Sequence, residues 1–361
     1  MSWRRWSMTG LDAPDLISHR QADYVVTLVD EQDRAIMQLP GVTGGEVVLS
    51  AMALLRGSGS LDLVDLDQPI DWSRHRVRIE YVLSSGSRWG LGVWLLAAPS
   101  ETYAAASRSW RVDLLPKTAI LDADALPASY SVARGANLVA AARAVIAGVG
   151  EGERVIATPT EKTAPATMVW PPGTSRLRIV NDLLEAAGYW GVWCDTDGFF
   201  RLEPYIEPAK RAPAWAFSAG ATAIHLPDFS REHDLASIPN RMVCVGQSEA
   251  DKPALVGVAT NERPDHPLSY QARGRWVTVT EEGVEATSQA ELEAIARRKL
   301  LALMAAKATL EIEHLPIPLA PNQVVEYVTA GVAVRASVRE LRYSLQPTDL
   351  TRTTLVEVMD L

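Results

Sequence analysis

The N-terminal third of the chain is a succession of short strand-like segments separated by turn residues, and this pattern limits the fold more than any other feature. Residues 24–29 are rich in β-branched and aromatic side chains, and residues 76–82 begin by alternating charged with apolar residues. Further segments of this kind lie at 35–39, 47–49, 60–64, 90–96 and 110–115. Roughly seven or eight short strands at such spacing are typical of a closed or nearly closed antiparallel barrel or a sandwich.

A different pattern interrupts the strands over residues 170–205. It begins with a Pro-Pro-Gly loop and continues with apolar residues at helical spacing. We expect a helix over 175–187, because Thr174 or Ser175 can cap its first turn. Gly188 can end it, since the residue after a helix commonly adopts a positive φ. This block therefore predicts a small α+β module between two strand-rich parts.

Residues 190–203 are expected to form a hairpin that turns at residues 195–198, with the sequence Asp-Thr-Asp-Gly. Such a sequence also begins many calcium-binding loops. An EF-hand loop requires glycine at its sixth position and glutamate at its twelfth. Counted from the first aspartate, those positions hold Phe200 and Ile206. The hairpin turn is therefore favoured over a calcium site.

The fold expected from these patterns is mainly β with some α, and the chain divides into four parts. The parts are an N-terminal arm (1–20), a first antiparallel barrel (21–118), an α+β module (119–235) with helices near 138–147 and 175–187, and a second barrel (236–361) with a helix at 288–305. The last helix is predicted from the capping box Ser-Gln-Ala-Glu at residues 288–291.

Charge and composition exclude several classes of protein. The chain has 361 residues and a net charge of −9, which argues against static binding to nucleic acid. It has no run of eighteen or more apolar residues, so we expect no stable insertion into a membrane. Cys194 and Cys244 are the only cysteines. They can form one disulfide, although two buried free thiols are favoured.

No arrangement of residues predicts catalysis, a cofactor or a metal site. The six histidines are scattered and form no HExxH motif, and the sequence contains no GxSxG nucleophile motif and no CxxC pair. His233, between Glu232 and Asp234, could contribute to a metal site, but a solvated charged loop is the favoured interpretation. We therefore expect a protein that is not an enzyme, with no catalytic, cofactor-binding or metal-binding residues.

Two surface features leave functional alternatives open. Arg76, Arg78 and Glu80 share one face of a predicted strand, and this face is either solvated or lines a channel or a subunit contact. Eleven tryptophans are many for this length. Three of them, Trp72, Trp89 and Trp94, lie on or beside predicted strands, where they pack in a core or anchor an interface.

Four stretches resemble the tail hub proteins of long-tailed bacteriophages. The stretches are WPPGTSRLRIVNDLLEAAGYWGVWCDTDGFFRLEPY, GSGSLDLVDLDQPIDWSRHRVRIEY, SQAELEAIARRKLLALMAAKATLEIEH with the following PLAPNQVVEY, and RASVRELRYSL. They correspond to the helix–hairpin module, the first-barrel strands, the helix and proline-led strand of the second barrel, and its next strand. The resemblance covers nearly all of the chain after about residue 20.

The resemblance implies two tube-like barrels per subunit and a homotrimer whose six barrels form a ring. Such a ring would join a six-fold tail tube to a three-fold tip at the distal end of the tail in the virion, and DNA would meet it only in transit. Implied partners are distal tail or tail tube proteins, the tape measure protein, and tip or central fibre proteins. We expect a net acidic or neutral channel wall, because phosphates bind clustered lysines and arginines. The alternative is a glycan-binding or cell-wall-degrading tail-tip protein that uses the tryptophans.

Overall fold

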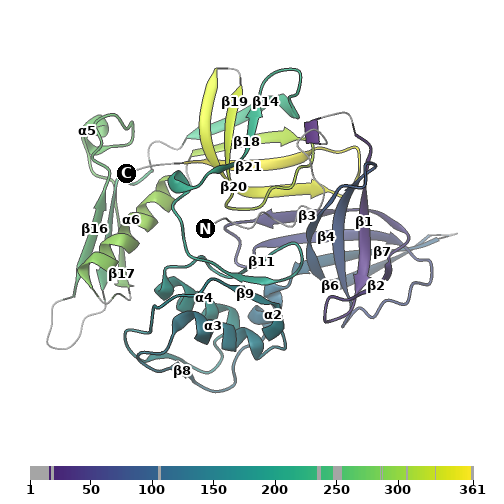
Figure 1. Cartoon of the computed structure of the whole chain (residues 1–361), viewed down its shortest axis with the longest axis horizontal. Helices are drawn as coiled ribbons and strands as arrows, with labels where there is room; N and C mark the ends of the chain where they lie inside the picture. The colour runs from purple at the N-terminus through teal and green to yellow at the C-terminus, as the bar shows by residue number, and fades with distance from the viewer. Residues whose placement is uncertain are drawn as a thin grey trace.

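The computed structural model describes residues 16–17, 20–104, 107–233, 237–246, 254–284, 286, 288–305, 308–329 and 331–358. It confirms a mainly β fold with some α (Figure 1). The N-terminal strands are β1 (Ala22–Val29), β2 (Ala35–Gln38), β3 (Val42–Ser50), β4 (Gly57–Val64), β5 (Arg76–Leu83), β6 (Arg88–Ala104) and β7 (Ser107–Pro116). The later strands that join them are β13 (Pro213–Ser218), β14 (His225–His233), β18 (Ala308–His314), β19 (Val324–Thr329), β20 (Val332–Ser344) and β21 (Thr351–Glu357).

Alternation along the sequence gives these strands one buried face and one solvated face. In β4, Leu61 and Leu63 are buried while Asp62 between them is partly exposed. In β5, Val77 and Ile79 are fully buried. Successive side chains of a strand point to opposite faces, so this two-residue period places one apolar row toward the core.

The pairing of β3 with β20 joins the two groups of strands into one continuous sheet. Residues 340–344 of β20 run antiparallel to residues 46–50 of β3. On its other edge β20 pairs with β21 through residues 336–342, and residues 332–337 pair with β19. The thirteen-stranded sheet has the order β14-β18-β21-β20-β3-β4-β7-β6-β5-β1-β2, with β19 beside β20 and β13 beside β19. Only β13 and β19 pair in parallel among its described strands. One hydrophobic core fills both halves and includes Leu61 from the first and Leu341 from the second.

The central module lies against one side of this sheet (Figure 1). Its elements are α2 (Thr118–Ala123), β8 (Tyr130–Val132), α3 (Leu138–Ala147), β9 (Val155–Ala157), β10 (Met168–Trp170), α4 (Arg176–Ala187), β11 (Trp193–Cys194) and β12 (Phe200–Leu202). The Ser175 hydroxyl accepts a hydrogen bond from the Arg178 N–H, and Gly188 ends α4 with a φ of 74°. Both are capping roles that the sequence predicts. Leu184 of α4 is fully buried in the core of this module.

A third group of elements has a separate core, and we call it the α6 unit. It contains β15 (Arg241–Gly246), β16 (Val256–Thr260), α5 (Tyr270–Arg273), β17 (Thr278–Val284) and α6 (Gln289–Ala305). β15 lies between an antiparallel β16 and a parallel β17, and α6 packs on β15 and β16. The sequence prediction placed this helix inside the second barrel. The structure places it outside, because β15 pairs with β16 and β17 instead of with the large sheet.

Two segments lie at positions that their sequence neighbours do not suggest. β13 and β14 fall within residues 119–235, yet they pair with β19 and β18 and so belong to the large sheet.

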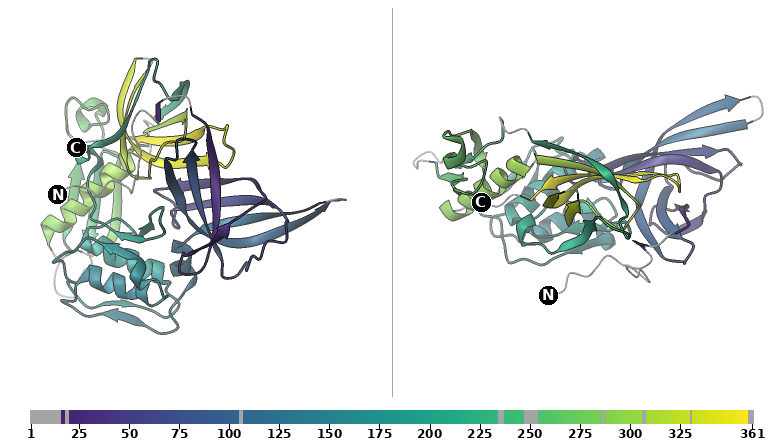
Figure 2. Two further views of the ribbon diagram at one scale, coloured as in Figure 1. Left: turned by 45° about the vertical axis from the view of Figure 1, so that its right-hand side comes forward. Right: turned by 90° about the horizontal axis from the view of Figure 1, so that it is seen from above.

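The β6–β7 hairpin extends well beyond the body of the sheet (Figure 2). Tyr103, near the end of the hairpin, is 72% exposed. The guanidinium carbon of Arg108 lies 5.5 Å from the centre of the Tyr103 ring.

Candidate functional site

The solvated face of the continuous sheet carries charged and hydroxyl side chains in rows that cross the strands. In one row Glu313 of β18, Arg352 of β21 and Arg342 of β20 are successive neighbours. In another, Asp62 of β4 stands beside Arg111 of β7. Small hydroxyl side chains occupy further outward positions: Ser58, Ser60, Ser109, Ser344 and Thr354. We call this surface, on β18, β21, β20, β3, β4 and β7, the charge-paired face.

Each of three arginines on the charge-paired face contacts a carboxylate of a neighbouring strand. The pairs are Arg352–Glu313 at 2.8 Å, Arg342–Glu46 at 2.6 Å and Arg111–Asp62 at 3.2 Å between nitrogen and oxygen. The hydrogen bond to Glu46 raises the pKa of Arg342. Partly exposed pairs of this kind contribute about 0–1 kcal/mol to stability. Their main effect is that these three guanidinium charges are already compensated, so these arginines are not free to bind a phosphate.

A buried cluster of charges fixes the central module to the sheet. Arg76 of β5 contacts Asp33 at 2.7 Å and Glu151 at 2.8 Å. Lys117, just before α2, contacts the same two carboxylates at 2.7 and 2.8 Å, and its ammonium also donates to the carbonyl oxygen of Gly198. Lys117 and the Asp33 side chain are fully buried. Bridging carboxylates and several hydrogen bonds are what a buried cation requires.

The strand face of Arg76, Arg78 and Glu80 differs from the expectation of a solvated or channel-lining surface. Arg76 is buried, and Arg78 donates a hydrogen bond to the Asp33 carbonyl oxygen. Burial lowers the pKa of Arg76, but hydrogen bonding to Asp33 and the charge of Glu151 outweigh burial and raise it. The prediction is wrong for Arg76 because the central module, which is distant in sequence, covers this part of β5.

Sequence reasoning missed Lys117, Asp33 and Glu151, which belong to no motif. One signal was available for Lys117. It is a single cation between the apolar residues 114–115 of β7 and the apolar helix at 119–121. A charged residue inside such a run is buried only when it has partners. The identity of those partners depends on tertiary contacts.

The histidines that the structure describes are not arranged for catalysis. His314 is fully buried, its Nδ1 lies 2.7 Å from the Leu315 carbonyl oxygen, and its Nε2 lies 2.8 Å from the Thr353 hydroxyl. Burial lowers the pKa of His314 to about 4. Among the described residues no group of three or more His, Cys, Asp or Glu side chains is placed to hold a metal. The side chain of His233 and the whole of Asp234 lie outside the described residues.

The other features that the sequence singled out have structural roles. Trp89 and Trp94 are buried in the core, and Trp72 packs on Trp110 with ring centres 5.0 Å apart. The Asp195 carboxylate accepts hydrogen bonds from the backbone N–H groups of Asp197 and Phe199, as a hairpin turn requires. Both cysteines, at positions 194 and 244, are free thiols. None of the described helices is both long and apolar enough to cross a membrane.

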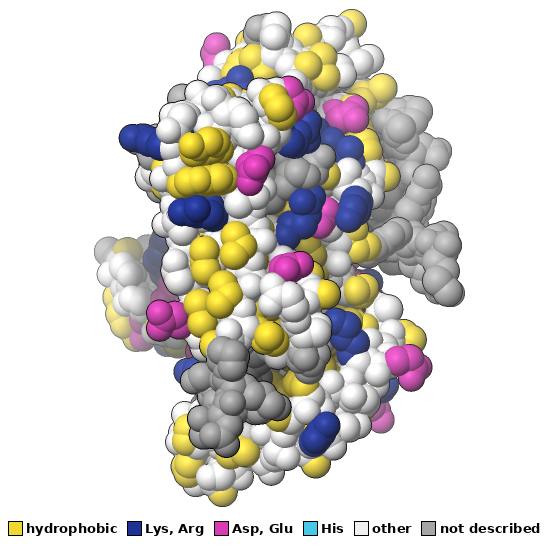
Figure 3. Space-filling view, turned by 90° about the vertical axis from the view of Figure 1, so that its left-hand side faces the viewer, with side chains coloured by type: hydrophobic (Ala, Val, Ile, Leu, Met, Phe, Trp, Pro, Cys, Tyr) yellow, Lys and Arg dark blue, Asp and Glu magenta, His cyan; other side chains and the backbone are white. Residues whose placement is uncertain are grey.

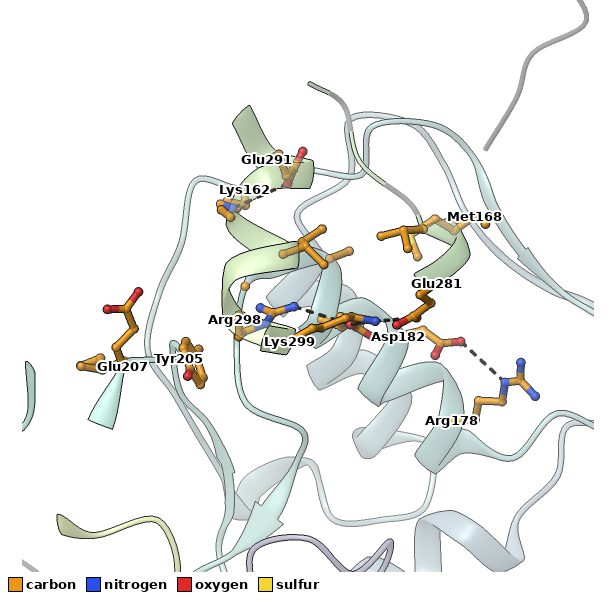
Figure 4. Close-up of a pocket in the computed structure, with 18 of the residues that line it drawn as sticks. Lys162, Met168, Arg178, Asp182, Tyr205, Glu207, Glu281, Glu291, Arg298 and Lys299 are labelled. Carbon is orange, nitrogen blue, oxygen red and sulfur yellow. Dashed lines mark hydrogen bonds and ion pairs between the residues drawn. The ribbon is translucent and has the colours of Figure 1, made fainter. Parts of the chain in front are cut away.

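A groove of about 750 Å³ separates the central module from the α6 unit (Figure 4). Its lining mixes apolar side chains, among them Trp170 and Ile295, with charged side chains of both signs. On the outside of the α6 unit, hydrophobic side chains form small patches between acidic and basic ones (Figure 3). Val256 and Val258 of β16 are 44% and 46% exposed.

No protein-family model and no curated protein matches this sequence, but solved structures match nearly all of it. A tail protein from Neisseria meningitidis has a TM-score of 0.68 at 15% identity, covering 94% of this chain and 97% of that one. The 43 kDa tail protein of prophage MuSo2 from Shewanella oneidensis has a TM-score of 0.67 at 13% identity, covering 93% and 98%. The chain has the fold of phage tail proteins.

This tail-protein fold extends to more distant relatives. A prophage tail protein from Listeria monocytogenes has a TM-score of 0.55 at 10% identity, and the match covers 92% of this chain and 94% of that one. The relationship to phage tail proteins that the sequence indicates is therefore confirmed by structure. At identities of 10% to 15% it is the tail-protein fold, and not individual contact residues, that these proteins share.

Proposed function

We propose that the chain is a tail hub protein of a long-tailed phage, and that three copies form a ring at the distal end of the tail. The continuous sheet carries this proposal. It gives one subunit two strand groups joined edge to edge by β3 and β20. Three subunits then supply six such groups, which match a six-fold tube on one side while the ring keeps three-fold symmetry toward the tip.

The charge-paired face is the surface that suits the inner wall of this ring. One polar row crosses the β3–β20 junction, from Ser344 through Glu46 to Ser60, whereas Arg342 stands opposite Val48. DNA that passes this wall meets Arg111, Arg342 and Arg352 already paired with carboxylates, and such arginines are not free to bind phosphates. The wall therefore admits DNA during ejection without holding it.

The proposed role is structural, and its partners are other tail components. They are distal tail or tail tube proteins on one side, tip or central fibre proteins on the other, and the tape measure protein along the axis. Trp89 and Trp94 are buried and so cannot stack on a glycan, and Trp72 packs against Trp110.

The mass and symmetry of the assembly test this function. Light scattering and electron microscopy of the purified protein should find a ring with three times the 39.3 kDa mass of the chain. Images of assembled tails should place that ring at the distal end. A ring of six chains would contradict the proposal, as would a chain that is monomeric both in isolation and in the tail.

A further inference from the structure

The α6 unit and the central module do not share a hydrophobic core. The buried core residues of the α6 unit are Ile238, Met242, Cys244, Ala259, Leu268, Val284, Leu292, Ala296, Leu300 and Met304. None of them belongs to the described core of the central module, which is built from α2, α3, α4 and the short strands around them. Each of the two bodies therefore buries its own apolar surface without the other.

Ion pairs across the groove connect the two bodies (Figure 4). Glu185 of α4 lies 3.5 Å from Arg298 and 3.7 Å from Lys299, both on α6. Two further pairs cross the groove: Glu207–Arg297 at 3.4 Å and Lys162–Glu291 at 3.9 Å. We call these four contacts the α4–α6 clasp. Glu185 is its centre, because it meets two cations of α6.

The clasp is weak and responds to salt. The Glu185 side chain is 56% exposed and that of Lys162 is 53% exposed. Exposed pairs lose most of their attraction to solvent screening. Beside them lies the groove of about 750 Å³, where the Arg298 guanidinium carbon also lies 5.7 Å from the centre of the Tyr205 ring, a cation–π contact that is itself electrostatic. The attraction between the two bodies at the groove is therefore mainly electrostatic.

We propose that the α4–α6 clasp is a conformational latch, from which the α6 unit opens as a rigid body when the ion pairs are screened or broken. Opening leaves both cores intact, since no core cluster of the described residues crosses the groove. It widens the groove and exposes its apolar lining, including Trp170 and Ile295. The proposal concerns the single subunit and does not rest on the ring.

Spin-label distances measure the opening directly. Nitroxides are placed at Ile156→Cys on β9 and Val258→Cys on β16, which are 44% and 46% exposed and lie outside the groove. The two native cysteines are replaced by alanine in this background. Raising the salt to about 1 M shortens the screening length to about 3 Å. The distance distribution should then shift to longer values.

Charge reversal separates the latch from general effects of salt. Glu185→Arg faces Arg298 and Lys299 with a like charge and should produce the longer distances already at low salt. Adding Arg298→Glu should move the distribution back toward that of the parent protein. The control Glu153→Arg makes the same change in net charge at an exposed position outside the groove and should leave the distribution unchanged.

Circular dichroism of the same variants shows whether both bodies stay folded, as the separate cores require. An unchanged distance distribution in folded Glu185→Arg would overturn the proposal. So would a distribution in the parent protein that does not respond to salt. Loss of helical signal in Glu185→Arg, without loss in Glu153→Arg, would also overturn it, because the clasp would then be needed for folding.

Discussion

Lys117 and Asp33 form a fully buried ion pair, with the lysine Nζ 2.7 Å from the aspartate Oδ2. Asp33 lies in the turn between β1 and β2, and its backbone adopts a positive φ of 59°. Lys117 lies between β7 and the first helix of the central module. The pair therefore ties a turn at the sheet edge to the start of the module, and Arg76 and Glu151 complete its hydrogen bonds.

Replacing Lys117 by methionine should destabilise the protein strongly. Two carboxylates would lose their shared ammonium group while remaining buried, and breaking a buried pair in this way costs about 3–5 kcal/mol. Urea unfolding monitored by tryptophan fluorescence measures the loss. Arg34→Met provides the control, because Arg34 is 73% exposed in its pair with Asp30 and should matter little. Equal stabilities of the two variants would contradict the structural role of Lys117.

Truncation of Leu184 to alanine should loosen the central module. The side chain is fully buried among the residues of that core, and a Leu-to-Ala change at such a site costs about 2–5 kcal/mol. Val169→Ala is the matched control, since Val169 belongs to the same module and is 63% exposed. Thermal unfolding of both variants measures the difference. An unchanged melting temperature in Leu184→Ala would mean that α4 does not pack as described.

Acidification should destabilise the second half of the sheet through His314. Burial lowers its pKa to about 4 in the folded protein, whereas an unfolded histidine has a pKa of about 6.5. Between these values the unfolded chain binds more protons than the folded one. Stability is therefore complete above about pH 6.5 and falls as the pH drops toward 4, by at most about 1.4 kcal/mol per pH unit for this group.

Denaturant unfolding at several pH values measures this slope. The variant His314→Leu with Thr353→Val removes the imidazole together with its hydrogen-bond partner and should flatten the slope between pH 6.5 and 4. His75→Leu, at a partly exposed position outside the hydrophobic core, serves as the control. A slope that is the same in the parent and the double variant would show that His314 binds its proton equally in the folded and the unfolded protein.

Inverting the acidic members of the charge-paired face should create DNA binding. The variant carries Glu46→Lys, Asp62→Lys and Glu313→Lys, so Arg111 and Arg352 lose their partners, Arg342 keeps only Glu340, and three cations are added. Affinity for double-stranded DNA should appear and fall steeply with salt, with a slope of about 0.9 per phosphate contact. The control carries Glu153→Lys, Glu161→Lys and Glu262→Lys, which are exposed positions elsewhere. Equal binding by both variants would mean that net charge, and not this face, governs the contact.

Local signals in the sequence predict the central module well. The helix over 175–187 follows from the spacing of its apolar residues, and its cap at Ser175 and its end at Gly188 each follow from the residues of one turn. The structure shows all three. Asn137 caps α3 in the same local way, because its side chain accepts a hydrogen bond from the Ala140 N–H. Such features depend on neighbours along the chain, which a sequence displays directly.

Features made by distant residues could not be predicted in the same way. The sequence indicates strands on both sides of the module, but not that Arg342 of β20 meets Glu46 of β3 across 296 positions. It likewise does not reveal that Lys117 meets Asp33. The helix expected over 288–305 exists as α6, yet its assignment to the second barrel depended on sequence order alone. Pairing of strands is set by which edges meet in three dimensions, and periodicity does not encode it.

The β3–β20 junction also sets the order in which the chain can finish folding during its synthesis. Glu46 leaves the ribosome 296 residues before Arg342. At 5–20 residues per second this interval is roughly 15 to 60 seconds. Throughout that time β3 presents one unpaired edge, and an open edge is a template for association with other chains. Polysomes that make this protein therefore hold many nascent chains whose β3 edge is open at the same time. The open edge is covered only when β20 has been synthesised and pairs with β3.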